Sequence, residues 1–160
     1  MKYLYIVLFI LVLLFLQIGI FPHLKIVGSF PNLIILSVLC LSILQGWKKS
    51  LIWIITAGLF LDLYSLNNFL GISVIGLLLA SYLACFLDQN TFKKTNVPSL
   101  MLVFLISIAA YNIILIILSK IFGLVFDFRI LGFFINLVYN LIFALPVFYI
   151  IKKWLIKNTK

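Results

Sequence analysis

The sequence predicts an all-α, polytopic integral membrane protein with six transmembrane helices and both termini in the cytoplasm. Of its 160 residues, 66% are hydrophobic and 9% are charged, and the mean hydropathy is +1.36. A soluble domain of this length could not bury so much apolar surface, because a small globule exposes a large share of its residues. Two further observations carry the prediction: apolar runs of spanning length and an uneven distribution of lysine between the connections.

Four apolar runs have about the 20 residues that a helix needs to cross a bilayer. They are Tyr3–Ile20, Leu70–Leu87, Pro98–Phe122 and Ile130–Ile151. The first run resembles a signal peptide, but it is longer than a signal core and Phe21-Pro22-His23 after it is a poor cleavage site. We therefore expect an uncleaved first helix.

Two shorter runs, Pro31–Gly46 and Leu51–Leu66, complete the six. The segment Gln45–Ser50 between them contains a glycine and two lysines, which favours a polar turn. Because both runs are short, a four-span arrangement with these segments partly shielded is the alternative. The connections are too short to fold alone, so residues 1–160 form a single transmembrane domain.

The basic residues orient the six helices. With a cytoplasmic N-terminus, the inner side holds Lys2, Lys48, Lys49, Lys93, Lys94, Lys152, Lys153, Lys157 and Lys160. The outer side holds Lys25, Lys120 and Arg129. This excess obeys the positive-inside rule. Topology and anionic lipid account for the net charge of +9, so we expect no nucleic-acid partner.

Small residues repeat every four positions on the predicted fourth helix. Gly76, Ala80 and Ala84 lie on one face, just after Ser73. Such a stripe lets helix backbones approach closely. We favour packing inside the protein over contact with another protein.

The predicted sixth helix carries Asn136, Asn140 and Ala144 on one face. An amide in lipid needs a partner from another helix, and Asn112 on the fifth helix is a candidate. Pro146 removes a backbone donor and should bend the sixth helix. The bent, amide-lined helix either borders a cavity or packs in the ordinary way.

Asp62 is unusual because it ends an apolar run in a chain with only three acids. It shares a helix face with Gly58, one turn earlier. A negative charge at the C-terminal end of its own helix opposes the helix dipole. Either the carboxylate reaches water on the outer side, or it pairs with donors from a neighbouring helix or loop, where Asn67 and Asn68 are nearby.

The sequence offers little to catalysis or to metal binding. His23 is the only histidine, and no cysteine–histidine cluster supplies metal ligands. Asp62, Asp88 and Asp127 belong to three separate turns, so no two carboxylates are expected to pair. No phosphate-binding glycine loop is present. We therefore expect no enzyme activity, no cofactor and no metal site.

Several motifs follow one another in a recognisable order. They are Pro31-Asn32-Leu33-Ile34-Ile35-Leu36, the inner turn Gly46-Trp47-Lys48-Lys49, then Ala57-Gly58-Leu59-Phe60-Leu61-Asp62-Leu63 and Leu70-Gly71. The order resembles the bacterial rod shape-determining protein MreD family, over essentially the whole chain. Asn32 stands where that family often has aspartate, which keeps the hydrogen-bonding shape and loses the charge.

The resemblance implies a non-enzymatic scaffold of the cell-wall elongation machinery in the bacterial inner membrane. It implies an MreC-like membrane partner and, through it, an MreB-like filament and a glycan polymerase–transpeptidase pair that makes lateral peptidoglycan. The candidate partner-binding or structural residues are Pro31, Asn32, Gly58, Asp62, Gly71, Asn112, Asn136 and Asn140.

The alternative is a substrate-binding membrane subunit of a vitamin or small-molecule uptake transporter, whose fold MreD resembles. Those subunits usually carry an alanine-rich docking patch on the first helix. Here Tyr3–Phe15 contains no alanine, glycine or serine. Only the asparagines of the last two helices are available as polar ligand contacts.

Overall fold

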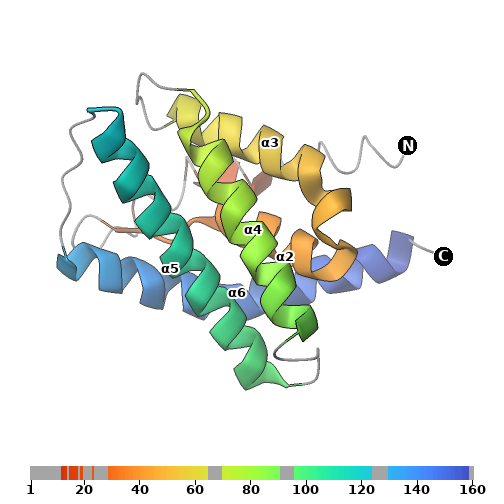
Figure 1. Cartoon of the computed structure of the whole chain (residues 1–160). Coiled ribbons are helices and arrows are strands. Elements are labelled where there is room, and N and C mark those ends of the chain that lie inside the picture. Colours follow the sequence, from red (N-terminus) through yellow and green to blue (C-terminus); the bar gives the residue numbers. More distant parts are fainter. Residues whose placement is uncertain are drawn as a thin grey trace.

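The computed structural model describes residues 12–13, 15–17, 19, 23, 29–64, 70–90, 96–123 and 130–158. Their regular structure is helical, with five helices of defined ends (Figure 1). These helices are α2 (Leu33–Gln45), α3 (Trp47–Tyr64), α4 (Ile72–Asn90), α5 (Val97–Ile121) and α6 (Ile130–Asn158). Described residues between 12 and 19 are helical too, inside the predicted first helix. The all-α prediction is confirmed for this part of the chain.

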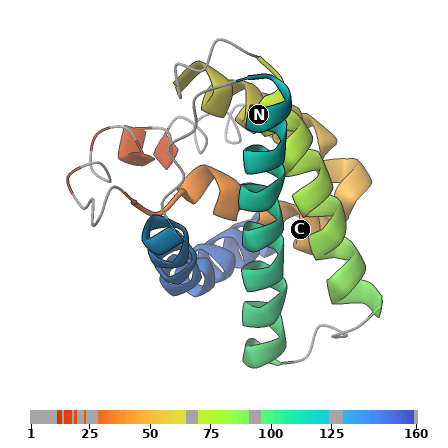
Figure 2. The same ribbon diagram turned by 60° about the vertical axis from the view of Figure 1, so that its left-hand side comes forward.

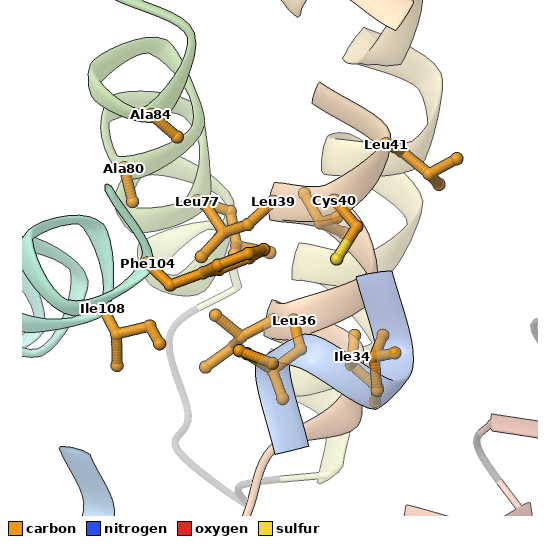
Figure 3. Close-up of a cluster of buried hydrophobic side chains, with 14 of the residues drawn as sticks. Ile34, Leu36, Leu39, Cys40, Leu41, Leu77, Ala80, Ala84, Phe104 and Ile108 are labelled. Carbon is orange, nitrogen blue, oxygen red and sulfur yellow. The ribbon is translucent and has the colours of Figure 1, made fainter. Parts of the chain in front are cut away.

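α2 is the central helix of the bundle, in contact with α3, α4, α5 and α6. Of its 13 residues, 11 are buried, which is expected of a helix that is apolar on every side. Leu36 and Leu39 of α2 meet Leu77 of α4 and Phe104 of α5 in the middle of the core (Figure 3). Phe104 also packs edge-to-face on Phe148 of α6, with ring centroids 6.3 Å apart.

The break between α2 and α3 is shorter than the predicted turn over Gln45–Ser50. Only Gly46 is non-helical, at φ +90°, a backbone conformation that side chains with a Cβ rarely adopt. Trp47 to Ser50 already form the first turn of α3. The polar residues therefore begin a helix instead of separating two helices, and α3 starts four residues before the predicted Leu51.

Three helices, α4, α5 and α6, are long and apolar enough to cross a membrane. α2 has a length of only about 20 Å, against about 30 Å of hydrocarbon. α3 has 18 residues but carries Lys48, Lys49 and Asp62. Outward-facing leucine, isoleucine and phenylalanine side chains cover α3 to α6, a surface suited to lipid.

α6 is one continuous helix of 29 residues through Pro146, and it extends beyond the predicted end at Ile151. Ile151 is buried and Leu155 packs against the core, so α6 stays packed on the bundle as far as Leu155. α4 likewise runs to Asn90, past the predicted end at Leu87.

The helices α3, α4 and α5 run in alternating directions, and α6 lies across them (Figures 1 and 2). In Figure 1 the C-terminus of α3, the N-terminus of α4 and the C-terminus of α5 lie at the upper left, while the C-terminus of α4 and the N-terminus of α5 lie toward the bottom. α6 runs from the left edge of this view to the right edge, and the junction of α2 with α3 lies on the right as well. In the turned view of Figure 2, α5 stands upright and the N-terminus of α6 lies at mid-height.

Candidate functional site

Asp62 is buried, with 2% of its surface exposed, so the solvent-reaching interpretation of this carboxylate is wrong. Its Oδ2 accepts a hydrogen bond from the Gly71 amide at 2.6 Å, and its Oδ1 accepts one from the Ser73 amide at 2.8 Å. Both donors belong to the start of α4. The candidates Asn67 and Asn68 lie outside the described residues.

The Asp62 carboxylate caps α4 from a neighbouring helix. The Gly71 carbonyl accepts the first helical bond of α4, from Ile75 at 3.0 Å, which makes Gly71 the N-cap residue. An N-cap side chain normally accepts from the amides of the first turn, but glycine has none. Asp62 supplies that acceptor, and its charge lies at the positive pole of the α4 dipole. This contact offsets the unfavourable position at the end of α3.

Gly58 lets the two helices approach closely enough for this cap. A Cβ added at Gly58 would lie 2.6 Å from the Cα of Val74, well inside van der Waals contact with α4 backbone. Gly71 has φ +108°, where only glycine is unstrained. We call Gly58, Asp62, Gly71, Ser73 and Val74 the α3–α4 junction.

The small-residue stripe continues the contact toward α5. Ser73, Ala80 and Ala84 are buried, as is Gly76, so the interpretation as internal packing is confirmed. A Cβ at Gly76 would lie 3.1 Å from the ring of Tyr111. The buried Tyr111 side chain in turn interacts with the side chain of Ser73. The α3–α4 junction is therefore also connected to α5 through Tyr111.

A second set of polar contacts surrounds the start of α2. Asn32 is its N-cap, and its side-chain oxygen accepts from the amides of Ile34 and Ile35 at 3.1 and 3.2 Å. The Asn32 backbone N–H donates to the side-chain Oδ1 of Asn140 on α6 at 2.8 Å. Asn140 is completely buried. The capped end of α2 is thus tied to α6.

Asn140 leads on to two further asparagines. Its Nδ2 donates to the Asn136 backbone and side-chain oxygens at 2.8 and 3.0 Å. Asn112 on α5 also donates to the Asn136 side-chain oxygen, at 3.2 Å. The predicted pairing of Asn112 with an asparagine of the last helix is confirmed. Asn136 itself donates weakly to the Phe30 carbonyl, at 3.5 Å.

Gln17 completes this set, and sequence reasoning missed it. Its Nε2 donates to the Pro31 carbonyl at 3.2 Å, while its Oε1 accepts from the Leu33 amide at 2.8 Å. Only 2% of its surface is exposed. The available signal was that Gln17 is the one amide in the predicted first helix. We call Gln17, Asn32, Asn112, Asn136 and Asn140 the amide cluster.

The amide cluster serves backbone that no helix can satisfy. Residues 29–32 are not helical, and buried backbone groups need hydrogen-bond partners. The side chains of Gln17 and Asn136 donate to carbonyls of this segment. The Asn140 side chain accepts a hydrogen bond from its backbone amide at Asn32. The Ser29 hydroxyl adds a bond to the Gly132 carbonyl at 2.9 Å. All eight candidate residues therefore lie in the α3–α4 junction, in the amide cluster or, as Pro31, beside it.

Neither set has the composition of a metal centre. Among the described residues, no three histidine, cysteine or acidic side chains come together. The Asp62 side chain, from α3, lies at the start of α4, which it caps. Asp88 is buried near the opposite end of α4. Asp127 lies outside the described residues. What both sets do chemically is hold helix ends in place.

Comparison with known protein families, with curated proteins and with solved structures finds no significant match.

Proposed function

We propose that this protein is a non-enzymatic membrane scaffold of the MreD type, acting in the cell-wall elongation machinery of a rod-shaped bacterium. In this role it binds an MreC-like partner in the cell membrane and supports lateral peptidoglycan synthesis. The observation that carries the proposal is the convergence of Gly58, Asp62 and Gly71 on one helix junction. The motif that resembles the family is thus a spatial unit with a physical purpose.

We propose six membrane crossings with both termini in the cytoplasm, the second made by the non-helical residues 29–32 together with the short helix α2. The alternating directions of α3, α4 and α5 support it (Figures 1 and 2). Lys48 and Lys49 are in the first turn of α3, and Lys152 and Lys153 are near the end of α6; the start of α3 and the end of α6 both lie on the right in Figure 1. Lys120 is in the last turn of α5, and the C-terminus of α5 lies at the upper left of Figure 1.

A scaffold needs a rigid interior, and the polar groups of this interior provide one. Asn140 is ten residues into α6, about 15 Å, which is near the middle of a bilayer if α6 starts at its surface. Irregular backbone at that depth is tolerated only when protein surrounds and satisfies it. The amide cluster satisfies residues 29–32 in this way and fixes the short helix α2 among its longer neighbours.

The second candidate is a substrate-binding subunit of an uptake transporter. The observation that favours it is the amide cluster itself, because convergent polar side chains between helices can recognise a small molecule. Against it, Gln17, Asn136 and Asn140 use their side chains on one another or on buried backbone. We therefore rank the scaffold first.

Depletion of the protein in its host separates the two functions. The scaffold proposal expects rods to become round while vitamin uptake continues. Normal cell shape with lost uptake of a vitamin would defeat the proposal.

Partner binding is tested by co-purification with the MreC-like protein, normalised to the amount of folded protein. Because Asp62 is buried, we expect Asp62→Ala to lower the yield of folded protein. The amount of partner that co-purifies with each folded molecule should change less. A normal yield with lost partner binding would show instead that the carboxylate contacts the partner directly.

A further inference from the structure

Four lysines lie at one end of the folded chain, although they are distant in sequence. Lys48 and Lys49 are exposed in the first turn of α3, and Lys152 and Lys153 are exposed near the end of α6. Both ribbon views place the start of α3 beside the last turns of α6 (Figures 1 and 2). We call these four residues the lysine end.

Aromatic side chains accompany the lysine end. Trp47 packs edge-to-face on Tyr82 of α4 with ring centroids 5.6 Å apart, and its indole donates to the Leu78 carbonyl at 3.3 Å. Tryptophan and tyrosine are enriched where a bilayer meets water. The half-buried Trp154 adds a second indole on α6. The Trp47–Tyr82 pair therefore favours a position of the α3 start at the level of the lipid headgroups.

The lysines are carried on helices that the core holds firmly. Ser50, one residue after Lys49, is fully buried and bonds to the Gly46 carbonyl at 3.1 Å. Ile151 anchors α6 directly before Lys152, whose ammonium group lies 6.0 Å from the centre of the Phe148 ring. Long lysine side chains on such anchors can extend along apolar surface and leave the charge among headgroups.

We propose that the lysine end is a binding surface for anionic phospholipid, with phosphatidylglycerol as the test ligand. The phosphate diesters lie against the four ammonium groups while the acyl chains follow the apolar outer faces of α3 and α6. Each lysine near an anionic surface strengthens attraction about fivefold. The lipid surface is independent of the shape-determining role, since it rests only on the charge, aromatic residues and geometry of this end.

The test uses the full chain purified in an uncharged detergent and titrated with phosphatidylglycerol or phosphatidylcholine. Bound lipid is counted by native mass spectrometry, and thermal unfolding is followed in parallel. We expect phosphatidylglycerol to bind and to raise the unfolding temperature more than phosphatidylcholine. Replacement of all four lysines by glutamine should weaken phosphatidylglycerol binding at least about tenfold, because four charges are removed.

Two control variants complete the design. Replacing the same four lysines by arginine keeps the charge and should retain binding, whereas Lys120→Gln removes an exposed charge at the other end and should leave binding unchanged. The proposal is overturned if the glutamine variant binds phosphatidylglycerol within about twofold of the original protein. Equal binding of the two lipids by the original protein would overturn it as well.

Discussion

The α3–α4 junction and the amide cluster solve the same problem with different chemistry. Each supplies an acceptor for the start of a helix, α4 in one case and α2 in the other. The junction uses one charged side chain and a glycine contact, while the amide cluster uses neutral side chains from several helices. A charged acceptor forms stronger hydrogen bonds than a neutral one. In a network of neutral side chains, the stabilising free energy is spread over many weaker hydrogen bonds. Substitutions in the junction should therefore cost more stability than substitutions in the cluster.

The largest effect should come from Gly58→Ala. The added Cβ would lie 2.6 Å from the Val74 backbone, so α3 and α4 must separate and strain the Asp62 cap. We expect a loss of about 3 kcal/mol, the upper part of the range for overpacking. Thermal unfolding in detergent measures it. The matched control is Gly19→Ala, where nothing lies within 4 Å of the new Cβ and stability should hold.

Asp62→Ala should be next in size. It leaves the Gly71 and Ser73 amides without their buried acceptor, at a cost of about 2 kcal/mol. Asp62→Asn should lose about half as much, because one oxygen still accepts while the new NH₂ group opposes the other amide. If the original protein, Asp62→Ala and Asp62→Asn unfolded at the same temperature, the contrast between the α3–α4 junction and the amide cluster would be wrong.

Within the amide cluster, Asn140→Ala should cost about 1 kcal/mol. The Asn32 amide loses its acceptor at the buried start of α2. Asn112→Ala should cost less, about 0.6 kcal/mol, because Asn136 keeps its bond from Asn140. The same unfolding measurement compares the two variants, and a larger loss from Asn112→Ala would contradict the order of bonds described here.

The smallest effect should come from Asn32→Asp. The cap needs only a side-chain oxygen toward Ile34 and Ile35, which aspartate also provides. The carboxylate would also lie at the positive pole of the α2 dipole, which offsets the cost of a charge at this depth, so we expect the unfolding free energies of Asn32→Asp and the original protein to agree within about 0.5 kcal/mol. Asn32→Ala is the matched comparison and should lose about 1 kcal/mol. If the aspartate variant were as unstable as the alanine variant, the acceptor role of residue 32 would be wrong.

Sequence reasoning reached those features that depend on helical periodicity. The four-residue spacing of Gly76, Ala80 and Ala84 indicated a packed face, and that of Asn136 and Asn140 indicated a shared one. Local helix electrostatics made Asp62 anomalous, because the rule considers only the helix that carries the charge. Its explanation lies nine residues further on, at the start of another helix.

Other features depended on tertiary contacts that periodicity does not report. Gln17 bonds to backbone around Asn32 in a segment with no regular pattern, so its position in an apolar run was not enough to identify its partners. Lysines next to a glycine favour a turn by composition, but the single glycine at positive φ is sufficient to end α2, so α3 begins at Trp47 with the lysines in its first turn.

Asp62 joins α3 to α4 inside the protein through its hydrogen bonds to the Gly71 and Ser73 amides. The most direct test is the amide proton chemical shifts of Gly71 and Ser73, measured by NMR in the original protein and in Asp62→Asn. Short hydrogen bonds to a carboxylate should place both protons downfield, and the variant should move both upfield while distant amides of α5 stay in place. Unchanged Gly71 and Ser73 signals would contradict the account.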